Sequence, residues 1–244
     1  MKLNPLTTRI RAAHADAWEV EGRARIGYGG GWARFPNVRL MASGIARAKW
    51  NNADITGPGA DLDRVVAWYG ERDIPWGIRV PLELDVSFGS HLFVKRCLAI
   101  RADTFRDRGS DPRIRRAEAT QLELLARLDA MGSGAVDESR AWIGPQLGAP
   151  GFTHWIAEFR SQPAGIATSV RSNGDAGPAA YITGVRAPDD EIREALIATA
   201  SLHAFSEGAD LVHANPWTDT EAGLFLGLGA VEVPGLEVRL VRPD

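Results

Sequence analysis

The sequence contains one cysteine among its 244 residues, Cys97. A single thiol cannot form a disulfide within the chain, which indicates a reducing compartment, so we expect a cytoplasmic protein. Cys97 stands in the apolar run HLFVKRCLAI, and we interpret it as a core thiol rather than a nucleophile. No run approaches the ~18 consecutive apolar residues of a membrane-spanning helix, and the first residues lack the apolar centre of a signal peptide. We therefore expect no membrane partner.

Several catalytic motifs are also missing. The five histidines include no pair at i, i+4, and no cysteine or acidic ladder accompanies them, so we predict no metal site. No G-x-S-x-G elbow or Walker loop occurs. The glycines at 29–31 lack the lysine and helix start that follow a phosphate loop, and we interpret them as a hairpin turn. A net charge of -3, with acidic residues among the arginines, argues against a nucleic-acid partner.

The composition is that of a globular protein, with 45% hydrophobic and 24% charged residues. The length allows one large domain or two of roughly 120 residues. Eight tryptophans are many for this length. Because indole rings are costly to expose to water, we expect several of them to line the core or a ligand cleft.

Periodicity and turn signals predict helices and strands along the whole chain. In the first half we expect helices over 5–20 and 61–69, a twisted strand pair over 22–35, and strands over 38–45, 75–80 and 91–101. In the second half we expect helices over 112–131, 188–207 and 220–228, and strands over 152–160, 165–171, 179–185, 210–214 and 231–241. The segment SNGDAG predicts a hairpin turn between two of these strands.

A charged stretch with glycine and proline, residues 106–118, is the best linker candidate. We therefore expect two domains, 1–110 and 111–244. The segments VVAWYGERDIPWGIRVP and SLHAFSEGADLVHANPW both read helix, turn, strand, proline. This faint echo indicates two related halves of an α/β protein.

The order of meander, helix, strand, helix and strand over residues 150–241 resembles the GNAT family of N-acetyltransferases. The resemblance rests on the strand AAYITGV, on the long helix from Pro188 and on the ending EAGLFLGLGAVEV. It implies an α+β fold of two tandem GNAT-like halves, the first degenerate, each a mixed, mostly antiparallel sheet flanked by helices. It also implies acetyl-CoA or another acyl-CoA as cofactor. The residues that match the cofactor positions are Ile182, Gly184, Val185, Arg186, Arg193 and Phe225.

Two departures from the family pattern concern these cofactor positions. The family binds the pyrophosphate with a glycine-containing loop before the long helix, whereas this chain has APDDEIREAL and no glycine. Asp189, Asp190 and Glu191 can cap a helix, yet they would repel a pyrophosphate by roughly 4 kcal/mol per close charge pair. An ordinary capped helix and a modified cofactor loop both remain open. Phe225 matches a position where many relatives carry a tyrosine acid, and it has no proton to give.

Candidate catalytic residues are His213 and Asn215, on and after the strand over 210–214, where the resemblance places the active cleft. His203 lies on a polar helix face, and we expect a surface role for it. Candidate substrate-binding residues form two groups near strand ends. They are Ser43, Trp50, Asn51 and Asn52 in the first half, and Trp217 and Asp219 in the second. A capping turn explains the asparagines equally well, and Thr218 or Asp219 can cap the following helix.

Two functions follow from these observations. The first is acyl transfer from a CoA or carrier-protein thioester to a small-molecule amine, in which backbone N–H groups near Gly184 and Val185 polarise the thioester carbonyl. The second is a GNAT fold that no longer uses acetyl-CoA and instead binds a small molecule or catalyses another reaction. In either case we expect a small-molecule partner, and the resemblance is compatible with a homodimer.

Overall fold

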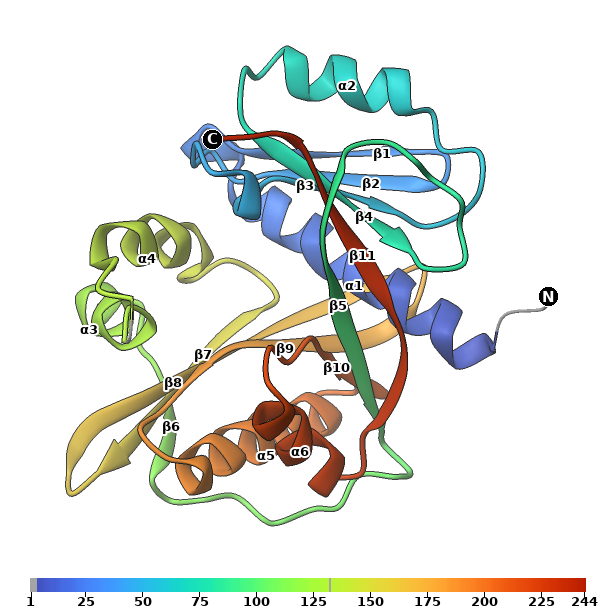
Figure 1. The fold of residues 1–244 in the computed structure, drawn as a ribbon. Helices are drawn as coiled ribbons and strands as arrows, with labels where there is room; N and C mark the ends of the chain where they lie inside the picture. Colours follow the sequence, from blue (N-terminus) through green and yellow to red (C-terminus); the bar gives the residue numbers. More distant parts are fainter. Residues whose placement is uncertain (1–3, 132) are drawn as a thin grey trace.

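The computed structural model describes residues 4–131 and 133–244, which contain one eleven-stranded mixed sheet. Its strands follow the order β1-β2-β3-β4-β11-β5-β10-β9-β8-β7-β6 (Figure 1). The strands are β1 (Gly31–Phe35), β2 (Val38–Ala42), β3 (Asn52–Ile55), β4 (Trp76–Pro81), β5 (Ser90–Arg101), β6 (Ile114–Arg116), β7 (Phe152–Phe159), β8 (Gln162–Gly174), β9 (Gly177–Arg186), β10 (Leu211–Ala214) and β11 (Val231–Arg242). The helices are α1 (Pro5–Ala24), α2 (Leu62–Gly70), α3 (Leu122–Asp129), α4 (Val136–Ile143), α5 (Asp190–Ser206) and α6 (Asp219–Gly227).

Most of the elements predicted from the sequence are confirmed, with two exceptions. The expected strand pair over 22–35 is wrong in its first part, because α1 continues to Ala24 and only β1 is extended. The expected helix over 112–131 is also wrong at its start. There the chain forms β6, which pairs with β7, and only then enters α3. Leucine spacing identified α3, while the pairing of a three-residue strand depends on a distant partner.

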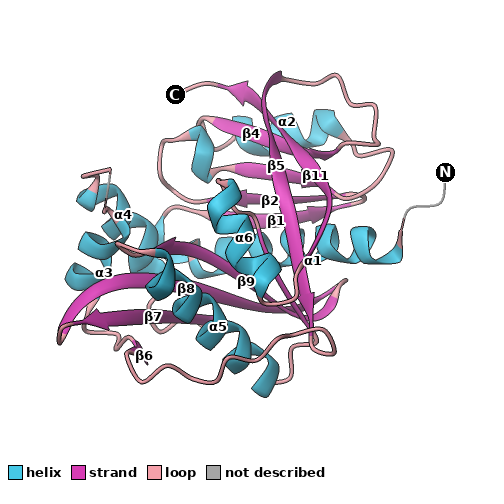
Figure 2. Ribbon diagram, turned by 60° about the horizontal axis from the view of Figure 1, so that its bottom comes forward, coloured by secondary structure: helices cyan, strands magenta, loops and turns pink. Residues whose placement is uncertain are grey.

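The two halves of the chain form related sheets joined through exchanged strands. β3 and β4 pair in parallel in the first half, as β9 and β10 do in the second. β11 pairs with both β4 and β5 (Figure 2). β5 also pairs with β10. Each half therefore contains one strand that the other half supplies, and this supports the tandem arrangement. The boundary at residue 110 falls between β5 and β6 and remains our proposal.

Helix α1 runs between the two halves of the sheet (Figures 1 and 2). Asn4 caps its first turn and Pro5 occupies a position where a missing N–H is harmless. Its apolar residues Ile10 and Ala13 pack against the second half. Its polar side chains are also buried, because both halves turn charged residues toward it: Arg39 of β2, for example, lies 3.5 Å from Glu19. α1 thus carries polar groups into the space between the halves.

The opposite faces of the sheet hold the larger apolar cores. α2 covers the first half with Val65, Trp68 and Tyr69, and the Tyr69 ring stacks on Trp76 at 4.4 Å. α5 and α6 cover the second half in a core that includes Leu196. α3 and α4 pack on the same side of the sheet as α1 (Figure 1). On the side with α1, α3 and α4, a groove along α1 and a cleft between the three helices and the sheet remain open.

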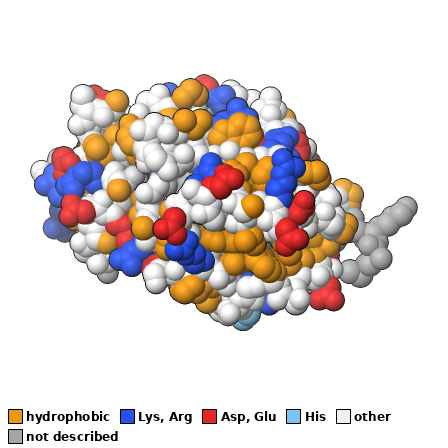
Figure 3. Space-filling model, turned by 90° about the horizontal axis from the view of Figure 1, so that it is seen from above, with side chains coloured by type: hydrophobic (Ala, Val, Ile, Leu, Met, Phe, Trp, Pro, Cys, Tyr) orange, Lys and Arg blue, Asp and Glu red, His pale blue; other side chains and the backbone are white. Residues whose placement is uncertain are grey.

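The surface carries both signs of charge. Figure 3 shows Lys and Arg side chains interspersed with Asp and Glu on one face, with apolar patches between them. Within residues 4–131 and 133–244, no helix has both the length and the apolar character needed to cross a bilayer.

Candidate functional site

Strands β9 and β10 separate next to a backbone bulge. Their parallel pairing ends at Ile182 and Ala214. On the other side of β9, Thr183 pairs with Thr168 of β8 and Arg186 pairs with Ile166, so two residues of β9 oppose one of β8. The first of them, Gly184, has φ +62°, a conformation that glycine adopts without strain. The bulge bends β9 away from β10 and leaves backbone groups without a ladder partner.

A cleft of about 380 Å³ opens beside this bulge. Its walls come from α1, α3, α4, the loop before β3 and the separated strand ends. Four of the eight tryptophans line it: Trp18, Trp50, Trp142 and Trp217. The Trp50 and Trp142 rings stack at 4.0 Å. The expectation that several indoles line a cleft is therefore confirmed.

Asp129, the last residue of α3, brings a carboxylate to the bulge. Its Oδ1 lies 3.8 Å from the point where a Cβ on Gly184 would stand. The other oxygen, Oδ2, accepts a 2.6 Å hydrogen bond from the Ser139 hydroxyl. Because Ser139 fixes one oxygen, the second is held toward the cleft. The sequence analysis missed Asp129, since nothing in the leucine-rich helix marks its last carboxylate as different from a surface residue.

A cationic cluster lies on the α1 side of the cleft. The Arg79 guanidinium and the Lys95 ammonium approach His14 Nε2 at 3.2 and 3.4 Å. Because both are donors, His14 Nε2 must be an acceptor, and burial lowers the pKa of His14 well below 6.5. Arg79 also lies 3.0 Å from Asp54. Desolvation, followed by repulsion from Arg79, lowers the pKa of Lys95 to about 7.

Sequence reasoning missed this cluster as well. His14 belongs to α1, Asp54 to β3, Arg79 to β4 and Lys95 to β5. Each stands alone in the sequence, at separations that match no motif. Only the packing of α1 against both halves of the sheet brings them together.

His213, predicted to be catalytic, lies in β10 and is 1% exposed. Its ring stacks on Tyr181 of β9 at 5.0 Å. Neither ring nitrogen makes a hydrogen bond of good geometry to a described residue, although the Ala13 carbonyl lies near enough to favour the protonated ring. Burial lowers the pKa of His213 to about 3. A group with so low a pKa is a weak proton acceptor at neutral pH.

Asn215, the other predicted catalytic residue, lines the cleft at the end of β10. Its Nδ2 donates to the Arg96 carbonyl at 2.6 Å and approaches Cys97 Sγ at 3.4 Å. Its Oδ1 has no partner among the described residues. Asn215 therefore anchors the strand end through Nδ2, while its buried Oδ1 is left without a hydrogen bond to a described residue.

The residues predicted to bind a cofactor lie in three different environments. Gly184 and the backbone of Ile182 border the cleft, whereas the Ile182 side chain packs in the core with Phe225. Phe225 is 1% exposed. It is not among the described residues that line the cleft or the neighbouring cavity at the start of α5. The remaining three, Val185, Arg186 and Arg193, line a second cavity of about 730 Å³ at the start of α5, and Arg186 lines the cleft as well.

The start of α5 is an ordinary capped helix end. Asp189 Oδ1 accepts from the Ile192 N–H at 2.8 Å, which occupies one of the free N–H groups that would bind a phosphate. Asp190 pairs with Arg193 at 2.9 Å, and Glu191 pairs with Arg113 at 2.8 Å. These carboxylates and the absence of glycine in the loop are unfavourable for the diphosphate of coenzyme A.

Ser43 and Asn51, predicted to bind substrate, hold a loop together. Asn51 Oδ1 accepts from the backbone N–H of Ser43 at 2.7 Å and from its hydroxyl at 2.9 Å. Asn51 Nδ2 donates to three carbonyls, those of Ile45, Arg47 and Pro75. Asn51 is fully buried, so its polar atoms are used within the protein. These contacts favour the capping-turn interpretation for this pair.

The other predicted substrate residues lie nearer to the cavities. Trp50 donates its indole N–H to Glu138 at 2.9 Å in the cleft wall. Asn52 lines a smaller neighbouring cavity. Trp217 is 67% exposed and lines the cleft, the cavity at α5 and the smaller cavity. Asp219 is exposed, pairs with Arg96 at 2.7 Å and leaves the capping of α6 to Thr218.

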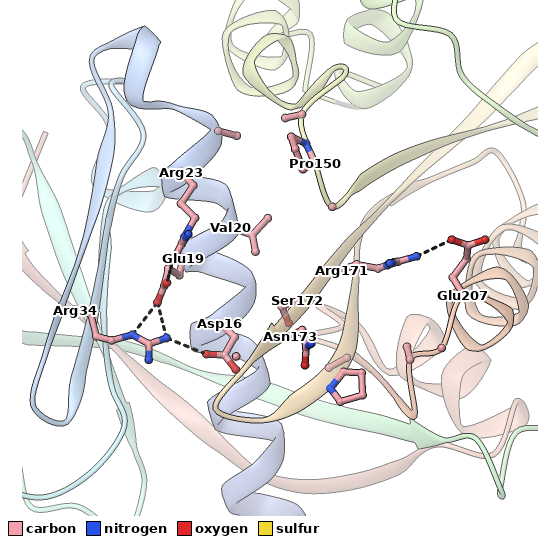
Figure 4. Close-up of a pocket in the computed structure, with 18 residues that line it drawn as sticks. Asp16, Glu19, Val20, Arg23, Arg34, Pro150, Arg171, Ser172, Asn173 and Glu207 are labelled. Atoms are coloured by element: carbon pink, nitrogen blue, oxygen red, sulfur yellow. Dashed lines mark hydrogen bonds and ion pairs between the residues drawn. The ribbon is translucent and has the colours of Figure 1, made fainter.

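A wider groove of about 810 Å³ lies along α1, away from the separated strands (Figure 4). Its charged side chains already form pairs. Arg34 contacts Glu19 at 3.0 Å, and Arg171 contacts Glu207 at 2.8 Å. Because the charged groups of the groove already have partners, the cleft at the bulge is the better candidate site.

The described residues contain no group of three or more His, Cys, Asp or Glu placed to hold a metal ion.

Comparison with solved structures agrees with this architecture. A GCN5-related N-acetyltransferase from Kribbella flavida superposes with a TM-score of 0.67 over 96% of each chain, at 15% identity. An acetyltransferase of the GNAT family from Novosphingobium aromaticivorans gives 0.61 over 97% of this chain and 99% of the other, at 15% identity. A protein of unknown function from Staphylococcus epidermidis gives 0.59 at 12% identity, covering 87% of this chain and 93% of its own.

Neither a family model nor a curated protein sequence matches the chain. The likeness is therefore one of structure rather than of sequence. It shows that the chain has the GNAT fold over nearly its whole length, as the resemblance in the sequence predicts.

Proposed function

We propose that the protein transfers an acyl group from a thioester to a small-molecule amine in the cleft between β9 and β10. The observation that carries this proposal is the bulge at Gly184 with the Asp129 carboxylate beside it. Acyl transfer needs a donor for the carbonyl oxygen and a base for the amine. The bulge supplies unpaired backbone groups, and Asp129 supplies the base.

The reaction balances with groups of this chain. The amine nitrogen bonds to the acyl carbon, the carbon–sulfur bond breaks, and the sulfur leaves with the bonding electrons. Asp129 Oδ1 takes the proton that the amine loses, while Ser139 keeps the carboxylate oriented. Backbone N–H groups near Gly184 and Val185 stabilise the negative charge on the carbonyl oxygen. Phe225 cannot protonate the sulfur, so the thiolate takes its proton from solvent after it has left the cleft.

The indole rings around the cleft favour this chemistry by limiting access of water. Trp50 and Trp142 form a stacked wall, and Trp217 covers the side toward α5. In a less polar cleft, the charges of the bulge and of Asp129 act more strongly than in water. We also propose a cytoplasmic location, which the buried single thiol of Cys97 supports.

Two donor classes match the proposal, acyl-CoA and a carrier-protein thioester. Both carry a pantetheine arm. The carboxylates at the start of α5 would repel only the phosphate groups at the far end of that arm. The test therefore compares acetyl-CoA with S-acetyl-N-acetylcysteamine, which ends before the diphosphate. We expect transfer from the short thioester to a panel of primary amines, followed as release of free thiol.

Substitution of Asp129 tests the assignment of the base. Asp129→Asn should lower kcat/KM for the transfer by about a hundredfold or more, because the amide cannot accept the amine proton. Asp137→Asn, an exposed position on α4, is the matched control and should stay within about twofold. An Asp129→Asn protein as active as the wild type, or a wild type without transfer from either donor, would overturn the proposal.

A further inference from the structure

A smaller cavity of about 220 Å³ adjoins the cleft on the side of β4 and β11. Four residues line both spaces: Trp18, Lys49, Lys95 and Trp217. The two spaces are therefore neighbours separated by shared side chains. Most of its walls are apolar, with Leu92 and Phe93 from β5 and Leu240 from β11.

The positive charge at this cavity exceeds the negative charge. Arg79 has Asp54 as its counter-ion at 3.0 Å, and Lys49 has Glu138. Lys95 has no carboxylate within 4.0 Å among the described residues, and its neighbour His14 is neutral because burial lowers the pKa of the imidazole. One cation of the cavity wall is left without a partner. A site with an unpaired cation and apolar walls favours an anion on an apolar body.

Two hydrogen-bond donors of the same wall also lack acceptors. Arg79 is 2% exposed, and its NH2 group makes no hydrogen bond to a described residue. Trp18 is 8% exposed, and its Nε1 is likewise without an acceptor. The Trp18 ring covers the Arg79 guanidinium, with the Cζ atom 3.9 Å from the ring centroid. Unpaired buried donors cost free energy, and acceptor atoms on a ligand would relieve that cost.

We propose that this cavity binds the carboxylate of the acyl acceptor through Lys95, above Arg79 and Trp18. The inference rests on the proposed function and narrows it: the substrate is an amine that also bears a carboxylate and an apolar body, with its amine toward Asp129. Carboxylate is favoured over a larger anion, because the cavity is small and one cation lacks a partner. The apolar walls from Phe93, Trp217 and Leu240 account for the body between the two ends.

Direct binding tests the site without any acyl donor. The probes are 3-phenylpropanoate and its uncharged amide, 3-phenylpropanamide, titrated into the full-length protein at pH 6.5 by calorimetry. We expect the carboxylate to bind about tenfold or more tightly than the amide, since a charge-assisted pair replaces an unpaired cation. Lys95→Met and Lys95→Gln should both remove this difference, and Lys95→Arg should keep part of it.

Arg160→Met removes an exposed cation far from the cavity and should leave both affinities unchanged. Circular dichroism of each variant shows whether it is folded. Two neutral variants of Lys95 are used so that the test still stands if one of them does not fold. Equal affinity for the two probes in the wild type, or an unchanged preference in both neutral variants, would overturn the anion site.

The two proposals fail in different ways. Acyl transfer to amines with and without a carboxylate at equal efficiency, together with equal binding of the two probes, removes the anion site and leaves the transferase. Carboxylate binding that depends on Lys95, in a protein that transfers no acyl group, removes the transferase and leaves the site.

Discussion

Tyr181 of β9 and His213 of β10 are paired one position before the two strands separate, with their rings 5.0 Å apart. Their stack closes the point from which the two strands separate, and His14 continues it with its ring 5.5 Å from Tyr181. Burial raises the pKa of Tyr181 to about 12 and lowers that of His213 to about 3. Both rings are therefore uncharged at neutral pH. The Tyr181 side of this stack borders the cleft, whereas His213 is not among the described residues that line it, and Asp129 and Lys95 lie in other parts of the cleft wall.

Asn51→Ala should destabilise the protein without changing the chemistry of the cleft. The substitution removes an acceptor of two hydrogen bonds and a donor to three carbonyls, all in the interior. We expect a loss of about 2–4 kcal/mol in the free energy of unfolding, measured by urea denaturation. Asn173→Ala, at an exposed position, is the control and should lie within about 0.5 kcal/mol of the wild type. If Asn51→Ala instead lost ligand binding while its free energy of unfolding stayed unchanged, Asn51 would be a substrate-binding residue.

Lys95 should make the stability depend on pH above neutrality. Its pKa is about 7 in the folded protein and about 10.5 in the unfolded chain, so between these values the unfolded chain binds more protons. The cost of burying the charge is therefore fully present below pH 7 and is relieved as the pH rises. Urea denaturation at pH 6.5 and 9.5 should show wild type gaining stability relative to Lys95→Met. A constant difference between the two proteins would contradict the assigned pKa.

Removing charge at the start of α5 should improve the affinity for acetyl-CoA. The variant Asp190→Asn with Glu191→Gln keeps the Asp189 cap and deletes two negative charges near the expected diphosphate position. Calorimetry should show about a tenfold gain in affinity, because repulsion is reduced while the helix is retained. Glu207→Gln removes a charge just after the other end of α5 and should give no gain. If the double variant behaves like this control, the carboxylates are not what excludes the diphosphate.

Phe225→Tyr should not supply an acid for the leaving sulfur. Phe225 is buried in the core between α6 and the sheet and is not among the described residues that line the cleft, so a hydroxyl at this position would lie in the core. We expect a destabilisation of about 1–3 kcal/mol in thermal or urea unfolding, from an unsatisfied buried hydroxyl. Transfer per folded molecule should be unchanged. Phe205→Tyr, at a partly exposed position of α5, is the milder control. A rise in kcat for Phe225→Tyr would show that position 225 reaches the sulfur.

The sequence predicts those parts of the fold that local signals determine. Asp61 caps α2, and the turn between β8 and β9 forms at SNGDAG, because both depend on neighbouring residues. β6 could not be predicted, since three residues become a strand only through β7. The cleft shows the same division. Gly184 could be placed from its strand pattern. The pKa of Lys95 is lowered first by burial and then by Arg79 on another strand, and both causes depend on the tertiary fold.

The pairing of β11 with β4 has a consequence for how the protein is made. Arg242, two residues from the carboxyl terminus, lies opposite Trp76 in the first half. During synthesis the first half leaves the ribosome well before β11, the neighbour of its inner edge, has been made. The two halves cannot complete the shared sheet until β11 is available. Until then β4 presents an unpaired edge, which exposes nascent chains to wrong edge-to-edge pairing.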